Sequence, residues 1–224
     1  MTSSSPVFKS DQHSHNTRRQ IRQQALQERQ RLSFYQQKKA AAALCRQLAK
    51  LAVYQQARSI ALYLSSRSEI GTRPVLEMAW RDGKTCYVPV IHPWRPHHMV
   101  FVRYQRGQRV VRNRWGIDEP ALSADRVKPW QLDLVLVPLV AFDLNGRRLG
   151  MGKGFYDRAF EFRQRGVRKP VLLGLAHDQQ LATCSLPVTH WDVNLDRVAT
   201  PSRAYCFNSV LRANRSGQHH SQER

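Results

Sequence analysis

The chain has 224 residues, and its 36 lysines and arginines against 16 aspartates and glutamates give a formal net charge of +20 at pH 7. The hydrophobic fraction of 42% is ordinary for a globular protein, and no apolar run reaches the roughly 18 residues that a transmembrane helix needs. These values exclude a membrane-spanning protein and favour a polyanionic partner, namely nucleic acid, an anionic membrane surface or a small polyanion.

The length suits one sizeable hydrophobic core, so we expect a single domain over residues 18–207. Residues 1–17 and 208–224 are polar, and we expect a disordered extension and a flexible tail there. The N-terminus also lacks the apolar region of a secretory signal. We expect reduced core or near-core thiols, in a cytoplasmic protein, at four widely spaced cysteines: Cys45, Cys86, Cys184 and Cys206.

Hydrophobic periodicity predicts helices over residues 18–31 and 36–51, with Ser33 as a cap at the break. Farther along, strands and helices alternate. We expect strands over 59–64, 85–91, 99–104, 132–142 and 171–176, and helices over 72–83 and 156–166. The fourth strand is apolar on both faces until Pro138, as in buried parallel sheets. This order predicts an α/β domain with a mostly parallel sheet, whose ligands bind beyond the carboxyl ends of the strands.

The stretch NGRRLGMGKGFYDR, residues 145–158, follows that strand and contains four of the eleven glycines. Glycines at every second position from Gly150 to Gly154 let the backbone approach a ligand and turn its N–H groups inward, and the next helix adds its positive end. The loop fits neither the dinucleotide fingerprint nor the Walker A pattern, because Phe155 replaces the third glycine and no Ser or Thr follows Lys153. We interpret it as an anion cradle; the alternative is a basic surface turn without a ligand.

Tyr156 and Asp157 follow the last of these glycines directly. They supply a phenol and a hard carboxylate. Mg²⁺ carried with ATP is usually held by one or two carboxylates together with phosphate oxygens and water. The combination therefore favours a nucleotide site over a plain surface turn.

The stretch RLGMGKGFYDR resembles the signature of the 5-formyltetrahydrofolate cyclo-ligase family, also called methenyltetrahydrofolate synthetase. LYLSSRSEIGT, WGIDEP and LPVTHWDVNLDRVATP are similar to further parts of that family, so the resemblance covers about residues 18–205. It implies a three-layer α/β/α fold with a mostly parallel sheet, of the sugar-phosphate isomerase and CoA-transferase type. It also implies ATP-dependent conversion of 5-formyltetrahydrofolate to 5,10-methenyltetrahydrofolate, with release of ADP and phosphate.

The same resemblance implies roles for individual residues. The ATP-binding set is Arg18, Arg22, Arg148, Leu149, Gly150, Met151, Gly152, Lys153, Gly154, Phe155 and Tyr156. The folate-binding set is Leu64, Glu69, Trp115, Phe155 and Tyr156. Tyr156, Lys153 and Arg148 are the expected catalytic residues, and Asp157 and Asp192 are the expected ligands of Mg²⁺.

Three positions depart from the family's pattern. Arg18 stands in place of a lysine, which keeps the charge and changes its reach and geometry. Met151 stands where many members have Tyr or Arg, and Phe155 where many have a tyrosine. A role that needs a hydroxyl would therefore fall to Tyr156.

As partners we expect ATP and 5-formyltetrahydrofolate, with or without a polyglutamate tail, and a monomer without a membrane or nucleic-acid partner. The basic run from Arg103 to Arg114 is interpreted as a solvated face, or as a surface that attracts the glutamate tail. Two alternatives remain. A nucleic-acid binder would lose RNA affinity steeply with salt and ignore ATP. A catalytically silent member of the family would bind folate tightly without turnover.

Overall fold

A computed structural model describes residues 6–66, 68–95, 97–113, 118–120 and 125–207, with the backbone alone for residues 6–16. The helices are α1 (Pro6–Gln30), α2 (Phe34–Ala49), α3 (Ala52–Gln56), α4 (Arg73–Arg81) and α5 (Phe155–Ala159), with 3₁₀ helices η1 (Pro129–Gln131), η2 (Glu161–Arg165) and η3 (Asp178–Gln180). The strands are β1 (Ser59–Leu62), β2 (Thr85–Ile91), β3 (Met99–Arg103), β4 (Val110–Arg112), β5 (Asp118–Pro120), β6 (Arg126–Val127), β7 (Leu134–Pro138), β8 (Ala141–Phe142), β9 (Arg148–Leu149), β10 (Val171–Leu175), β11 (Arg197–Ala199) and β12 (Ala204–Cys206).

The main sheet has the strand order β12-β11-β10-β7-β1-β2-β3-β6. The central strands from β11 to β2 pair in parallel, whereas β12, β3 and β6 join the edges antiparallel. The other sheets in the described residues are two small antiparallel ones, β4-β5 and β8-β9. The mostly parallel α/β sheet predicted from the sequence is thus confirmed.

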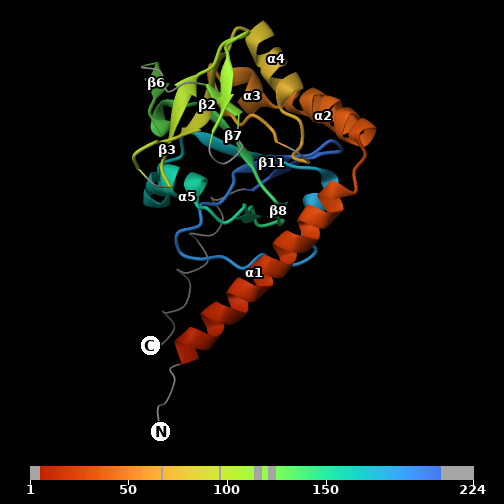
Figure 1. The fold of residues 1–224 in the computed structure, drawn as a ribbon, viewed down its shortest axis with the longest axis vertical. Coiled ribbons are helices and arrows are strands. Elements are labelled where there is room, and N and C mark those ends of the chain that lie inside the picture. Colours follow the sequence, from red (N-terminus) through yellow and green to blue (C-terminus); the bar gives the residue numbers. More distant parts are fainter. Residues whose placement is uncertain (1–5, 67, 96, 114–117, 121–124, 208–224) are drawn as a thin grey trace, which may run out of the picture.

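Both faces of the central strands are buried, which explains why these strands are almost continuously apolar. In β1, Ile60 and Leu62 belong to the cluster under α2, α3 and α4, while Ala61 belongs to the opposite cluster. That second cluster contains Phe101 and Phe160, whose ring centroids lie 5.8 Å apart. Figure 1 shows α2, α3 and α4 together on one side of the sheet and α5 on the other, the three layers implied by the resemblance.

The helix α1 begins at Pro6, earlier than predicted, so residues 6–17 are helical where the sequence predicts a disordered extension. Its residues Ile21 and Ala25 pack against a small cluster that includes Leu149. This contact ties the second half of α1 to the β8–β9 hairpin, and the helix runs on past the sheet toward the N-terminus (Figure 1). None of the helices in the described residues is long and apolar enough to cross a membrane.

The second helix starts where the sequence predicts a cap. Ser33 Oγ accepts a hydrogen bond from the Gln36 N–H at 3.2 Å, and Gln36 Oε1 accepts one from the Ser33 N–H at 2.8 Å. This reciprocal pair satisfies two N–H groups that the helix start would otherwise leave without partners.

Two predicted elements are divided in the structure. The strand over 132–142 ends at Pro138, which has no N–H for the ladder, and its last residues form β8 in another sheet. The helix over 156–166 becomes the five-residue α5 and then η2, because Phe160 leaves helical geometry with φ −116° and is fully buried in the core. The cysteines also differ from expectation: none of the four forms a disulfide, but Cys184 and Cys206 are exposed.

Candidate functional site

A cavity of about 300 Å³ opens beyond the carboxyl ends of β1 and β7. Residues 138–140, at the end of β7 and just beyond it, and Glu69 in the loop after β1 line it from the sheet side. The rest of the lining comes from segments far apart in the sequence: Arg18, Arg22, Arg148, residues 150–157, Trp191 and Asp192. The location agrees with the sequence prediction, because ligands of parallel sheets bind where the carboxyl ends of the strands leave a crevice.

The glycine loop, residues 150–154, joins the β8–β9 hairpin to α5. Gly146 turns this hairpin with φ 77°, and a Cβ there would lie 2.8 Å from a backbone oxygen. Gly152 and Gly154 also have positive φ, 89° and 67°. Among the described hydrogen bonds, the N–H groups of Gly150, Gly152 and Gly154 donate to no protein acceptor. They are therefore available to an acceptor outside the chain, and binding of an anion stays a prediction.

Arg158 supports this loop from α5. Its guanidinium donates to the carbonyl oxygen of Lys153 and, at 3.0 Å, to that of His97. The helix itself contributes less than predicted, because a helix of five residues has only a weak macrodipole. The loop's affinity for an anion would thus depend on its amides and on nearby cations.

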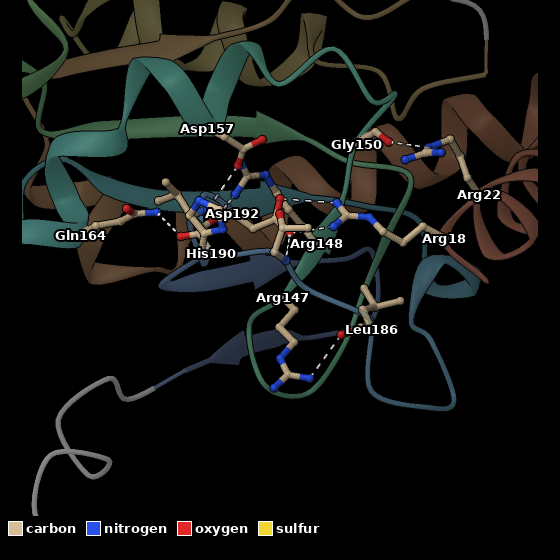
Figure 2. Close-up of polar contacts among 12 residues, drawn as sticks. Arg18, Arg22, Arg147, Arg148, Gly150, Asp157, Gln164, Leu186, His190 and Asp192 are labelled. Carbon is tan, nitrogen blue, oxygen red and sulfur yellow. Dashed lines mark hydrogen bonds and ion pairs between the residues drawn. The ribbon is translucent and has the colours of Figure 1, made fainter. Parts of the chain in front are cut away.

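Two of those cations come from α1, one turn apart (Figure 2). Arg22 Nε donates to the carbonyl oxygen of Gly150 at 2.8 Å, and Arg18 Nη1 forms an ion pair with Asp192 Oδ2 at 2.8 Å. Burial lowers the pKa of Arg22, and the neighbouring charge of Arg18 lowers it further. Two like charges held this close favour an anionic ligand between them.

A second ion pair lies beside the first (Figure 2). Arg148 Nη2 contacts Asp157 Oδ1 at 2.6 Å, while Arg148 Nη1 donates to the carbonyl oxygen of Val193. The same Asp157 oxygen accepts the Val193 N–H at 3.2 Å. The side chain of Arg148 is only 6% exposed, so its main visible role is to fix the Asp157 carboxylate.

Tyr156 and Glu69 bring a phenol and a carboxylate to the same cavity. Burial, and then the charge of Glu69, raise the pKa of Tyr156 far above its usual value, so its phenol stays protonated and able to donate. The Glu69 carboxylate is held in place by the N–H and Oγ of Ser66, at 2.9 and 3.2 Å.

Comparison with known proteins shows which protein family this sequence matches. The sequence model of the 5-formyltetrahydrofolate cyclo-ligase family matches residues 14–201. The chain belongs to this family. It is 44% identical to the 5-formyltetrahydrofolate cyclo-ligase of Escherichia coli strain K12 over 150 residues, which cover 66% of this chain and 81% of that one. It is 40% identical to the Haemophilus influenzae cyclo-ligase over 179 residues, 80% of this chain and 94% of that one.

A solved cyclo-ligase structure has the same fold. The 5,10-methenyltetrahydrofolate synthetase of Aquifex aeolicus superposes with a TM-score of 0.73 at 26% identity, covering 91% of this chain and 99% of that one. The fold and family expected from the sequence are both confirmed. As a member of this ligase family, the chain is an enzyme.

The cavity is lined by every residue that the resemblance assigned to ATP, folate or Mg²⁺, except three. Leu149 is fully buried in the cluster beneath α1. Leu64 is half-buried, packs on the core and lines a different cavity beside α4. Trp115 lies outside the described residues.

Sequence reasoning missed two parts of the lining. Trp191 is 55% exposed at the cavity, with its ring centroid 4.4 Å from that of His190. A large aromatic residue next to the predicted metal ligand Asp192 was the available signal. Residues 138–140 left no such signal, because they reach the site only through the end of a buried strand.

The basic run from Arg103 to Arg114 contributes no described residue to this cavity. Exposed ion pairs join Arg103 to Asp125, Arg106 to Glu77 and Arg112 to Asp118. Such pairs add little to stability in water. The solvated-face interpretation fits these contacts, and attraction of a glutamate tail stays a prediction.

Proposed function

We propose that the chain catalyses the ATP- and Mg²⁺-dependent cyclisation of 5-formyltetrahydrofolate to 5,10-methenyltetrahydrofolate, with release of ADP and phosphate. One observation carries the proposal: the glycine loop, a protonated phenol, Glu69 and two carboxylates line a single cavity. The E. coli and H. influenzae relatives are named 5-formyltetrahydrofolate cyclo-ligase, which supports the substrate and the cyclisation. The absence of disulfides among the four cysteines agrees with a reducing compartment, such as the cytoplasm. We also propose that the protein is a monomer.

The phosphates of ATP would bind the glycine loop. The amides of Gly150, Gly152 and Gly154 supply donors, and Lys153, Arg18 and Arg22 supply positive charge at the same cavity. Each hydrogen bond to a charged phosphate contributes about 1.5–3 kcal/mol net, so a few of them support micromolar binding. Phosphoryl transfer requires mainly such positioning and charge neutralisation.

Mg²⁺ would be held by Asp157 and Asp192 together with phosphate oxygens. The donors fit a hard cation. Asp157 Oδ2 has no hydrogen-bond partner among the described residues, whereas both oxygens of Asp192 face Arg18 and would have to exchange that partner. No group of three or more metal-ligating side chains exists in the described residues, so the cation would arrive with ATP. When bound, it would neutralise charge on the phosphates.

The folate would lie between Glu69 and the aromatic residues at the cavity. A carboxylate accepts hydrogen bonds from the N–H groups of a pterin, and Phe155 offers a flat apolar face. Tyr156, which burial keeps protonated, would donate to the formyl oxygen.

The reaction would proceed in two steps. In the first, the formyl oxygen forms a bond to the γ-phosphorus and the bond to the β-phosphate bridging oxygen breaks, which releases ADP. In the second, N10 forms a bond to the activated formyl carbon and loses its proton to solvent, while the carbon–oxygen bond breaks and phosphate leaves. In both steps the residues of the chain bind and orient the two substrates, and they exclude water.

The test is purified protein with 5-formyltetrahydrofolate, Mg²⁺ and ATP, followed by the near-ultraviolet absorbance of the methenyl product. We expect ATP-dependent product, and a loss of about 100-fold in kcat/KM for Lys153→Ala. Lys38→Ala removes an exposed lysine of α2 outside the cavity and serves as the matched control, with unchanged turnover.

Absence of product from the unmodified chain would overturn the proposal. Tight folate binding without product would establish the catalytically silent alternative. Salt-sensitive RNA binding that ignores ATP would instead support the nucleic-acid alternative.

A further inference from the structure

Behind the cavity lies a group of buried polar side chains that the proposed reaction does not use. Arg29, on the same face of α1 as Arg18 and Arg22, is only 6% exposed. His177, after β10, is 1% exposed, and Gln180 of η3 is 3% exposed. Burying an arginine is costly unless its donors are satisfied, so its contacts are informative.

Arg29 contacts two segments that line the cavity. Its Nε donates to Ser68 Oγ at 3.2 Å, and its Nη1 donates to the carbonyl oxygen of Leu139 at 3.5 Å. Ser68 directly precedes Glu69, the proposed folate ligand, and Leu139 follows β7. The charge of Glu69 also stabilises the positive charge of Arg29 against burial.

Gln180 contacts one of these two segments, and His177 lies near the other. The backbone of Ser68 lies near enough to the His177 imidazole to raise its pKa, which opposes the effect of burial. Gln180 Nε2 donates to the carbonyl oxygens of Leu139 and Val140 at 2.8 and 2.9 Å. Burial, and then the positive charge of Arg29, lower the pKa of His177 to about 4, so the ring is neutral. Its Nε2 is buried without a partner among the described residues.

We propose that Arg29 is a positioning residue for folate binding, which acts by holding Ser68 and thereby fixes Glu69 at the cavity. The proposal rests on the proposed function, since it assigns Glu69 to the folate. The Ser66 contacts orient the Glu69 carboxylate within its own loop, whereas Arg29 ties that loop to α1. Because α1 also carries Arg18 and Arg22, one helix would set the geometry of the nucleotide side and the folate side together.

The test is equilibrium binding of 5-formyltetrahydrofolate without ATP, together with KM for each substrate. Arg29→Met keeps the length of the side chain and removes its donors. We expect the folate Kd to rise about tenfold or more while the KM for ATP changes by less than about twofold. Arg29→Lys should restore part of the folate affinity. Ser68→Ala removes only the acceptor and should weaken folate binding without unfolding the chain, even if Arg29→Met does not fold.

The matched control is Arg163→Met. Arg163 is similarly enclosed, with an 11% exposed side chain, but it pairs with Asp196 at 2.8 Å and lies outside the cavity lining. The Arg163→Met substitution should lower the stability of the fold and leave the affinities for both substrates unchanged. Unchanged folate Kd in both Arg29→Met and Ser68→Ala would overturn the proposal. Failure of the unmodified chain to bind folate would instead overturn the proposed function.

Discussion

Arg18 and Asp192 are 174 residues apart in sequence, yet their side chains form an ion pair of 2.8 Å in the cavity. Burial alone would raise the pKa of Asp192, but hydrogen bonds from Arg18 and from the Thr189 N–H lower it on balance. The contact fastens the N-terminal helix over the site. It also pairs a residue expected to bind phosphate with one expected to bind Mg²⁺, so ligand binding would require both to change partners.

Replacing Arg18 should therefore weaken nucleotide binding. For Arg18→Gln we expect the KM for ATP to rise about tenfold, because one cation is lost from the phosphate side of the cavity. The measurement is ATP-dependent turnover at saturating folate. Arg19→Gln, at an exposed position on the same helix, is the control. Equal KM values for the two variants would show that Arg18 does not contact the nucleotide.

Arg148 and Arg147 are adjacent in sequence and serve different structures. Arg148 fixes Asp157, while Arg147 Nη1 donates to the carbonyl oxygen of Leu186 on the far side of the hairpin (Figure 2). Arg148→Lys cannot contact Asp157 and Val193 with the same fork, so kcat/KM should fall about 100-fold. Arg147→Lys should retain activity. Steady-state kinetics of the two variants test this, and similar losses in both would contradict it.

Gly150 allows the approach of a ligand to the loop to be tested separately from the backbone conformation that a glycine permits. Its φ is not in the left-handed region, and an added Cβ would meet no protein atom within 4 Å. Gly150→Ala should therefore leave the melting temperature unchanged and raise the KM for ATP, because only an approaching phosphate would contact the methyl group. Gly152→Ala, at φ 89°, should lower stability as well. Thermal unfolding with ATP titration distinguishes the two, and normal ATP affinity in Gly150→Ala would count against the cradle.

His177 should make stability dependent on pH. Its folded pKa of about 4 lies below the ordinary 6.5, so between these values the unfolded chain binds a proton that the folded chain does not. The free energy of unfolding should consequently fall as the pH drops from 6.5 toward 4, with a slope approaching roughly one proton. Urea unfolding across this range measures it.

In His177→Gln the slope over this range should be shallower, because the glutamine does not titrate. His98→Gln, at an exposed position, should keep the slope of the unmodified chain. The carboxylates with lowered pKa values, Asp133 and Asp192, lose their contribution below 3.8 and do not mask the effect. An unchanged slope in His177→Gln would exclude this histidine as the source.

The sequence by itself determined the alternating strands, the position of the site and most of its lining. Apolar runs such as residues 171–176 and the glycine spacing from Gly150 to Gly154 are local patterns, and each follows from the burial or backbone geometry of its own segment. Local patterns did not reveal that Phe160 would leave the helix, because its burial against Phe101 depends on a strand nearly sixty residues away.

Only the tertiary structure decided the partners of the charged residues. Four segments converge at the carboxyl end of the sheet: α1, the β8–β9 hairpin, the loop after β1 and the segment before β11. This convergence brings together Arg18 and Asp192, Arg148 and Val193, and Arg29 and Ser68. A basic residue on a polar helix gives no local sign of its partner. Its burial and its ion pair exist only once distant segments have removed the water around it.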